Sequence, residues 1–549
     1  MKNNMKNIYH KSAGKGIKGL SAVLLASLMA LNFGCTKDFE EYNTNPTALS
    51  PEQTTALLKS AIGPIEQEIF HNYQIAQNLS ADAFSGYMMP PTPFNGGINN
   101  MNYSLNNGWN STGFNDQYNF VMAPISKIGQ SEVKTKSPEA WGIALLVQVM
   151  AMSRVTDKFG PIPYTTAGSS LVSTPYENQK TVYDAFFRQI DTAATNLQAY
   201  ITAKPGTPAF YDKGDLVYQG DPVKWLKLAN SLRLRLATRI VKADAATAKL
   251  QGEKALSAPG GLLTTVTDNA AVAQSGTRDN DLWVVTVSYD GDNALGAALQ
   301  SYLVGYNDPR LPVYATPATD PLFTGQYIGI RSGANTSFNG LGKAGYKTYS
   351  SINSSDNLRS PAGQKAPQIL MTAAEVWFLK AEAALRGWTG AGDAQTNYET
   401  GITTSLQQWN VSAGNYLADA TSRPTAYVDP KNPANNAAAV STITVRWDAA
   451  ASNEQKLERI ITQKWLAIFP DGQEAWSEFR RTGYPKLFTV ANNFSNGTIN
   501  TQTQIRRLPY PSTEFGNGNS AEVVKAVGLL GGPDNGGTRL WWDVDKSNF

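Results

Sequence analysis

Few residues in this chain of 549 are suited to nucleophilic, redox or metal chemistry. Cys35 is the only cysteine, and His71 is the only histidine beyond residue 34. This composition excludes zinc sites made of cysteine and histidine, catalytic Cys–His pairs and haem ligation, and it allows a Ser–His triad only through His71. His71 lies in a stretch that we expect to be helical, and we interpret it as a surface or capping residue.

Carboxylates, lysines, tyrosines and serines remain as candidates for catalysis. The chain has 44 acidic residues, so composition alone does not exclude a carboxylate pair that hydrolyses a glycosidic bond. The Asp-Gly-Asp at 290–292 lacks the alternating oxygen ligands and the final glutamate of an EF-hand calcium loop. No phosphate-binding loop, dinucleotide-binding glycine pattern or nucleophile elbow is present. We therefore expect no enzymatic activity, no cofactor and no metal site.

Aromatic residues among amides and glycines indicate binding rather than catalysis. Trp109 lies in residues 86–115, and Trp283 and Tyr289 lie in residues 280–293. A flat aromatic ring packs on the C–H face of a sugar, while Asn, Asp and Arg side chains bond the hydroxyls. We expect Trp109, Trp283 and Tyr289 to contact a ligand; the alternative is that they fix loose loops to the scaffold. Other aromatics expected to be exposed in the first stretch are Tyr87, Phe94 and Phe114.

Segments with helical periodicity must hold these loops in place. Residues 221–243 carry a row of apolar residues at spacings of three and four, with Asp221 as the expected N-cap and Pro222 as the first helical residue. Many such segments come in adjacent pairs that resemble tetratricopeptide hairpins, although no strict repeat is present. The expected helices are 138–159, 180–201, 221–243, 245–256, 367–386, 391–409, 453–469 and 472–482.

Long stretches rich in Gly, Asn, Ser, Pro and aromatic residues separate the helical segments. They cover residues 85–119, 259–365 and 412–451. Loops of this length are uncommon in a compact domain unless they are functional or fold irregularly on a scaffold. We therefore predict a mainly α fold, in which tetratricopeptide-like helix pairs form a scaffold and a loop-rich, irregular region binds the ligand.

The N-terminus resembles the export signal of a bacterial lipoprotein. Residues 1–19 contain lysines and no acid, and residues 20–33 form an uncharged apolar run that is too short to span a membrane. Cys35 follows Gly34 directly, as in a lipobox, where a peptidase cuts before the cysteine and its sulfur is acylated. We expect Cys35 to be lipidated; the alternative is a free thiol after a secretory signal.

Cleavage before Cys35 would leave a signal peptide 1–34, a lipidated tether 35–50 and a single helical domain 51–549. Loss of the leader's five lysines would change the formal net charge from +3 to −2. A slightly acidic chain has no basic footprint for nucleic acid, so we expect no nucleic-acid partner. The acidic run 37–41 resembles the signal for the outer face of the outer membrane in Bacteroidetes, which favours a lipid anchor there that faces the exterior.

Six sequence blocks, in order, resemble the SusD/RagB family of Bacteroidetes outer-membrane lipoproteins, most closely its SusD-like second branch. The resemblance implies a mostly helical fold with four tetratricopeptide-like helix pairs and an irregular ligand-binding region. The blocks are the lipobox with its acidic run, DPVKWLKLANSLRLRLATRI (221–240), NDPRL (307–311), LMTAAEVWFLKAEAALRG (370–387), IITQKWLAIFPDGQEAWSEFRRTGYPKL (460–487) and RRLPYPSTEFGNGN (506–519).

The resemblance also implies a function without catalysis. Members of the family bind an oligosaccharide, or sometimes a peptide, and deliver it to a SusC-like TonB-dependent transporter in the outer membrane. Their ligand-contacting residues vary, so none can be assigned here by motif. The alternatives are a surface glycan hydrolase and a peptide-binding or adhesive lipoprotein.

The blocks also have physical roles of their own. Arg480 and Arg481 stand near a helix end, where they can meet C-terminal carbonyls. Asp308 and Pro309 favour a turn that leaves Arg310 free to bridge a carboxylate. The apolar face expected to be buried in block 460–487 consists of Trp465, Ile468, Phe469, Trp476 and Phe479.

Overall fold

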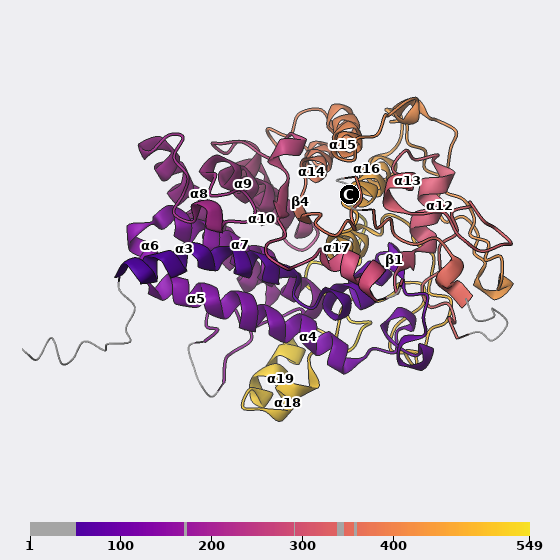
Figure 1. The fold of residues 1–549 in the computed structure, drawn as a ribbon, viewed down its shortest axis with the longest axis horizontal. Helices are drawn as coiled ribbons and strands as arrows, with labels where there is room; N and C mark the ends of the chain where they lie inside the picture. The colour runs from indigo at the N-terminus through magenta and orange to yellow at the C-terminus, as the bar shows by residue number, and fades with distance from the viewer. Residues whose placement is uncertain (1–50, 169–172, 290, 338–344, 356–358) are drawn as a thin grey trace, which may run out of the picture. The chain divides into compact units, whose positions relative to one another are not determined.

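Helices account for most of the regular structure in the computed structural model (Figure 1). The chain divides into two units, Met1–Leu57 and Leu58–Phe549. Cys35 and the expected segments 1–34 and 35–50 lie outside the described residues. The structure describes residues 51–168, 173–289, 291–337, 345–355 and 359–549.

Four helix pairs follow one another in the described part of the second unit. The helices of each pair pack on each other, and neighbouring pairs pack through α8 on α9, α9 on α14 and α14 on α16. This arrangement confirms the mainly α fold class with a tetratricopeptide-like scaffold. The pairs are α7 (Pro138–Phe159) with α8 (Gln179–Ala203), α9 (Pro222–Arg239) with α10 (Ala245–Leu256), α14 (Ala373–Leu385) with α15 (Ala394–Gln408), and α16 (Asn453–Ala467) with α17 (Gly472–Thr482).

Helix α9 shows how the apolar rows of the sequence become the core. Its predicted cap is confirmed, because a carboxylate oxygen of Asp221 accepts hydrogen bonds from the backbone N–H groups of Val223 and Lys224 at 2.9 and 3.1 Å. The helix ends at Arg239, before the predicted end at 243. The apolar row is at most 1% exposed throughout: Trp225, Leu228, Leu232, Leu236 and Ile240.

The predicted buried face of block 460–487 also becomes part of the core. All of its apolar residues are buried, and Phe479 is the most exposed of them at 8%. Burial of large aromatic side chains removes much apolar surface from water and is the main force that joins α16 and α17 to the scaffold. The set is Trp465, Ile468, Phe469, Trp476 and Phe479.

Charged side chains are also buried where α9, α16 and α17 meet. Arg239 of α9 donates to Glu478 of α17 at 2.7 Å and also contacts Glu474. Lys464 of α16 donates to Glu474 at 3.1 Å. Because a cation from α9 and a cation from α16 contact the same carboxylate of α17, Glu474, this network fixes how both helices sit on α17.

Arg480 and Arg481, at the end of α17, take different partners. Arg480 donates to the backbone carbonyls of Asp157 and Arg506 at 2.7 and 2.9 Å, so it meets carbonyls of other segments. Arg481 does not cap carbonyls as predicted but donates to both carboxylate oxygens of Glu382 at 2.6 and 2.7 Å. The prediction was wrong for Arg481 because α14 brings a buried carboxylate to it.

Residues 367–386 do not form one helix, as the sequence predicted. Gln368–Met371 is strand β4, which pairs antiparallel with β2 (Ala270–Val272), and α14 begins only at Ala373. Thr372 separates strand from helix, because its hydroxyl accepts a hydrogen bond from the backbone of Glu375 at 3.2 Å. A short apolar run has no periodicity that distinguishes a strand from a buried helix.

The loop-rich stretches contain more regular structure than predicted. Residues 85–119 include the helix α4 (Asn107–Gln117), which is capped by Asn106. The predicted turn is confirmed: Arg310 donates to the two oxygens of Asp308 at 2.9 and 2.6 Å. Other elements are the π-helical segments η3 (Gln74–Asp82), η6 (Tyr118–Met122) and η9 (Val284–Ser288), the antiparallel pair β1 (Met88–Met89) and β3 (Ala294–Leu295), and helices α5 (Ala123–Gln130), α6 (Val133–Lys136), α11 (Asp281–Trp283), α12 (Ala297–Gly305), α13 (Leu311–Tyr314), α18 (Ser512–Gly516) and α19 (Ser520–Leu529).

A second apolar cluster lies under these loops. Tyr346 and Tyr349 belong to it, and their hydroxyls donate to opposite oxygens of Asp429, which ties two of the long stretches together. None of the helices in the described ranges is long and apolar enough to cross a membrane. The cluster consists of Leu79, Ala83, Met89, Met101, Ala294, Ala318, Phe323, Ile330, Ala334, Tyr346 and Tyr349.

Candidate functional site

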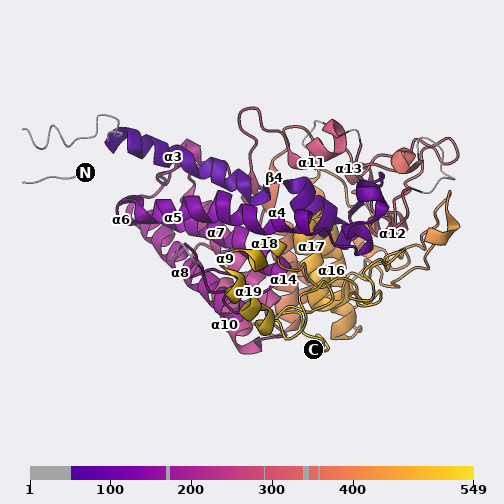
Figure 2. The same cartoon turned by 90° about the horizontal axis from the view of Figure 1, so that it is seen from below.

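Trp109 lies in the first turn of α4 and is half-buried. Its backbone N–H donates to the side chain of the cap Asn106 at 3.2 Å, and its ring meets Phe94 edge to face with centroids 6.4 Å apart. The ring packs against the second apolar cluster. The start of α4 is also held from the C-terminal side, because the Ser512 hydroxyl donates to Asn107 at 2.7 Å and α18 lies beside α4 (Figure 2). Trp109 is therefore a fixed aromatic with part of its surface in solvent.

Trp283 and Tyr289 bracket the π-helical segment η9. The Asn280 side chain caps α11 by accepting hydrogen bonds from the backbone of Leu282 and Trp283 at 3.0 and 3.1 Å. Trp283 is half-buried, whereas Tyr289 is 46% exposed. Within the described residues, the Tyr289 hydroxyl has no hydrogen-bond partner. This pair therefore presents one partly exposed ring and one free hydroxyl to solvent.

Both groups of aromatics are connected to η3, one by packing and the other by hydrogen bonds. Helix α4 packs on η3 directly. On the other side, Asn78 of η3 donates to the side chain of Asn293 at 3.4 Å, and Asn293 donates to Thr286 of η9 at 3.4 Å. Trp109 thus lies on a helix that packs on η3, whereas Trp283 and Tyr289 flank a segment that is linked to η3 through Asn293. In the described residues, no ring contact joins the three.

Two of the three π-helical segments in the described residues belong to this surface, namely η3 and η9, which lies between Trp283 and Tyr289. The third, η6, follows α4. A π turn is rare, because its wider ring distorts the backbone, and it is found frequently at functional sites. This clustering, which has no simple sequence signal, supports the surface over η3 as the candidate site.

A charged cluster that the sequence did not predict links α4 to α11. Arg278 donates to Glu68 at 2.9 Å and lies 3.5 Å from Asp281, and His71 contacts both Glu68 and Asp116. The interpretation of His71 as a surface or capping residue is confirmed, because His71 is the C-cap of the short helix Glu68–Phe70 and its backbone N–H donates to the Glu68 carbonyl. Its ring is partly exposed, but it stacks on Phe120 at a centroid distance of 4.1 Å and it lies in a turn between helical segments. These residues come from segments that are far apart in the sequence. The sequence therefore showed their residue types but not that they lie close together in the fold.

The cluster predicts a pH effect on stability. Burial raises the pKa of Asp281 to about 6, although the charge of Arg278 opposes the change. The unfolded chain takes up this proton only near pH ~3.9, so the folded state gains stability as the pH falls through 6. We expect wild type to gain about 1 kcal/mol of unfolding free energy between pH 7 and pH 5, relative to Asp281→Asn. Urea denaturation of both proteins at the two pH values measures this difference, and an equal pH dependence of the two would contradict it.

Two aromatics that we expected to be exposed belong to the core instead. Tyr87 and Phe114 are 0% and 3% exposed, and only Phe94 stays partly exposed. Phe114 packs edge to face on Phe159 of α7 at a centroid distance of 5.1 Å. The expectation failed because asparagines and glycines around these residues form helix caps and close contacts rather than open loops.

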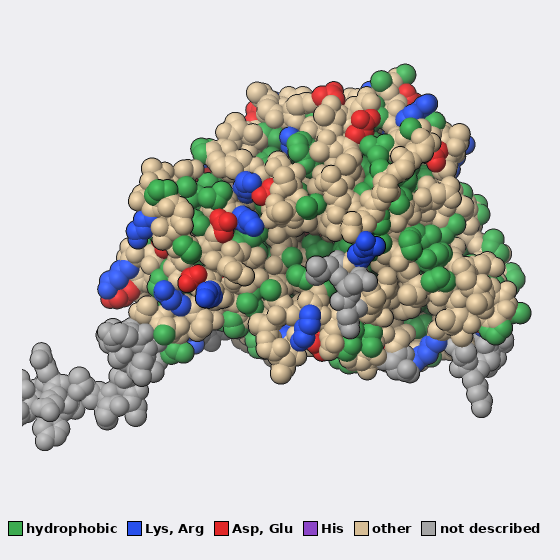
Figure 3. Space-filling model, turned by 45° about the horizontal axis from the view of Figure 1, so that its top comes forward, with side chains coloured by type: hydrophobic (Ala, Val, Ile, Leu, Met, Phe, Trp, Pro, Cys, Tyr) green, Lys and Arg blue, Asp and Glu red, His purple; other side chains and the backbone are tan. Residues whose placement is uncertain are grey.

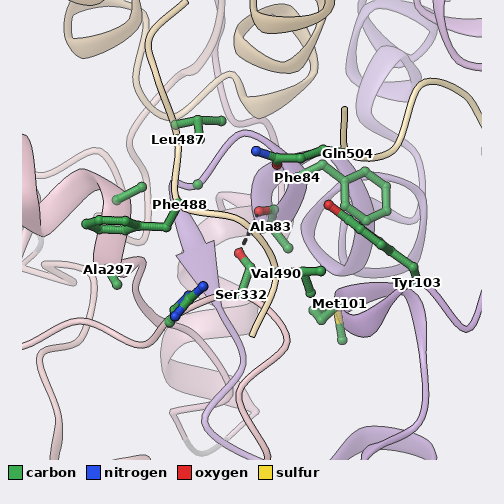
Figure 4. A pocket seen from close by; sticks show the side chains of 13 residues that line it. Ala83, Phe84, Met101, Tyr103, Ala297, Ser332, Leu487, Phe488, Val490 and Gln504 are labelled. Carbon is green, nitrogen blue, oxygen red and sulfur yellow. Dashed lines mark hydrogen bonds between the residues drawn. The ribbon is translucent and has the colours of Figure 1, made fainter. Parts of the chain in front are cut away.

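The cavities of the described residues do not coincide with the predicted aromatics. The cavity in Figure 4, between Phe84, Tyr103 and Phe488, has a volume of about 20 Å³, which holds one water molecule and no sugar. Two larger clefts, of about 1010 and 850 Å³, lie between α8, α9 and α10 and between α5, α7 and α8. None of these is lined by Trp109, Trp283 or Tyr289.

Within the described ranges, no group of His, Cys, Asp and Glu is arranged to hold a metal ion.

Charge is unevenly distributed over the face drawn in Figure 3. Lysines, arginines and acids gather towards its left edge, whereas hydrophobic and uncharged polar side chains dominate its right-hand part. The right-hand side is that of α12 and the surrounding loops in Figure 1. The right-hand part of this face therefore mixes hydrophobic and uncharged polar side chains, with charged ones mainly along its upper edge, and neutral sugars contact surfaces of this mixed kind.

Comparison with known proteins identifies the family. The model of the family described as Susd and RagB outer membrane lipoprotein matches residues 38–543. A chitin-binding SusD homologue from Flavobacterium johnsoniae is 40% identical, with a TM-score of 0.82 over 90% of this chain and 100% of that one. SusD homologues from Bacteroides vulgatus and Bacteroides uniformis are each 36% identical, with TM-scores of 0.84 and 0.81. They are matched over 91% and 89% of this chain and over 100% and 99% of their own.

The comparison with curated protein sequences found no match. The family match nevertheless covers nearly the whole chain, and it agrees with the helix pairs and the loop-rich region seen in the structure. The chain therefore belongs to the SusD/RagB family of outer-membrane lipoproteins.

Proposed function

We propose that this protein captures a nutrient oligosaccharide at the cell surface and delivers it, without catalysis, to a SusC-like TonB-dependent transporter. The observation that carries the proposal is the pair Trp283 and Tyr289, held at the two ends of η9 and open to solvent. Family membership supports a binding role, and the relative from Flavobacterium johnsoniae is described as chitin-binding.

The chemistry of the surface fits a sugar. The Asn280 cap holds the backbone of Trp283, the ring of Trp283 is partly exposed, and the Tyr289 hydroxyl is free to bond a sugar hydroxyl. Trp109 offers a second anchored ring on the far side of η3. An oligosaccharide that spans η3 would contact both sides.

Binding measurements test this assignment. We expect the double variant Trp283→Ala, Tyr289→Ala to bind its preferred oligosaccharide at least about tenfold more weakly, because each stacked ring contributes on the order of 1 kcal/mol beyond its buried area. Titration calorimetry against N-acetylglucosamine, glucose and xylose oligomers would identify the ligand and give both affinities. The matched control is Phe549→Ala, whose ring is 47% exposed, close to the value for Tyr289.

The same experiments separate the alternatives. Release of sugar at catalytic rates would make the protein a glycan hydrolase, and binding of peptides alone would make it a peptide receptor or adhesin. Failure to co-purify a SusC-like barrel in mild detergent would overturn the delivery role.

We also propose that residues 35–50 form a lipidated tether, that 51–549 act as one domain and that the protein faces the exterior.

A further inference from the structure

We propose a second binding site, for an oligosaccharide that carries carboxylate groups, in the cleft between α5, α6, α7 and α8. This cleft has a volume of about 850 Å³, which lies within the range of about 300–1,000 Å³ found for ligand pockets. The four helices that form it lie together on the left of Figure 1. It is distinct from the surface over η3, and none of its lining residues is Trp109, Trp283 or Tyr289.

Three cations from three helices line the cleft, and no acid does. They are Lys127 of α5, Lys134 of α6 and Arg188 of α8. Among the described residues, none of the three forms an ion pair. Neighbouring lysines behave differently: Lys136 pairs with Glu132 at 2.6 Å, and Lys180 pairs with Asp184 at 3.1 Å. Unpaired charges of one sign around a concave surface concentrate anions there.

The nearest carboxylate on the 163–177 segment is occupied elsewhere. Glu177 does not line the cleft. One of its oxygens accepts hydrogen bonds from the backbone N–H groups of Tyr164 and Thr165 at 3.3 and 2.7 Å, and from the Thr165 hydroxyl at 3.0 Å. This carboxylate therefore holds the wall of the cleft together and, within the described residues, forms no ion pair with the cations of the cleft.

The floor between the cations suits a sugar ring. Trp141 of α7 lies against α5 at Gly129, where an added β-carbon would come within 2.7 Å of the indole. Lys134 Nζ lies 5.7 Å from the indole centroid. Within the described residues, the indole N–H has no acceptor. The Gln148 amide donates to the Tyr164 hydroxyl at 3.3 Å, and both residues line the same cleft as Trp141.

The combination of three cations with an aromatic ring favours one class of anionic ligand over others. The three cations come from different helices and surround an aromatic and amide surface, so the fitting ligand has spaced negative charges separated by apolar C–H faces and hydroxyls. A carboxylated oligosaccharide has this pattern. A compact anion such as phosphate would use one cation, and an acidic peptide has no sugar face for Trp141.

Titration calorimetry with trigalacturonic acid tests the proposal. Wild type should bind it at least tenfold more tightly than it binds the neutral galactotriose. The double variant Lys127→Gln, Arg188→Gln should lose at least tenfold in affinity. Lys136→Gln, in the same short helix as Lys134 but outside the cleft, should keep the wild-type affinity, and so should Trp283→Ala.

Four results would overturn the proposal. They are the absence of trigalacturonate binding, equal or tighter binding of hexaglutamate, unchanged affinity in the Lys127→Gln, Arg188→Gln variant, and loss of binding in Trp283→Ala, which would place the probe on η3. Circular dichroism of each variant verifies that it is folded. Because the η3 surface is tested with neutral sugars, either site can fail without the other.

Discussion

Replacing Arg481 with alanine should lower the free energy of unfolding by about 3–5 kcal/mol, the usual cost of removing one partner of a buried ion pair. Arg481 is 0% exposed and donates to Glu382 with two nitrogens and to Glu478 at 2.7 Å. Burial by itself would raise the pKa of Glu382, but Arg481 and Arg386 hold it well below its usual range. Without Arg481, two buried carboxylates lose their strongest partner.

Urea denaturation monitored by tryptophan fluorescence measures this loss. Arg423→Ala is the matched control, because Arg423 is exposed and forms no ion pair among the described residues. It should change stability by no more than about 0.5 kcal/mol. A loss of less than about 1 kcal/mol in Arg481→Ala would show that Arg386, Arg239 and Lys464 suffice to compensate the two carboxylates.

Replacing Cys35 with alanine should move the protein from the membrane fraction to the soluble fraction. Each lipid methylene that is buried in a membrane contributes about 0.8 kcal/mol, and several acyl chains on one cysteine hold a protein durably. Fractionation of cells and the intact mass of the purified protein measure the change. Thr36→Ala, one residue further on, should leave both unchanged.

Membrane retention of Cys35→Ala, with an intact mass that differs from that of the wild type only by the lost sulfur atom, would refute the lipid anchor. Release or retention of the Cys35→Ala protein also bears on how the ligand is delivered to a transporter. A released protein that still binds its oligosaccharide would show that capture resides in the folded domain and that the anchor serves to keep it beside its partner.

The sequence determined the helices that have strong local signals. The predicted ranges 138–159, 245–256 and 472–482 agree with α7, α10 and α17 at both ends. Helical periodicity and capping are local, because apolar residues at spacings of three and four share one face and a side chain such as Asp221 satisfies nearby N–H groups. The family could also be identified from the sequence, because its blocks occur in order along the chain.

Only the tertiary structure decided which side chains meet. Tyr87 and Phe114 looked exposed among asparagines but are buried, and Arg481 found a carboxylate on α14 instead of carbonyls of its own helix. Residues 368–371 became a strand because β2, almost a hundred residues earlier, supplies its partner. Such choices depend on contacts between distant segments.

For the candidate sites, too, the sequence showed the residue types and only the tertiary structure showed which residues lie together. The sequence singled out Trp109, Trp283 and Tyr289 by residue type, but it did not show that the segments that carry them are connected through η3. It gave no sign that Lys127, Lys134 and Arg188 line one cleft, because a charge on a helix face is ordinary wherever it faces water. Residue type and periodicity are local properties, whereas a binding site depends on which helix faces the fold turns towards each other.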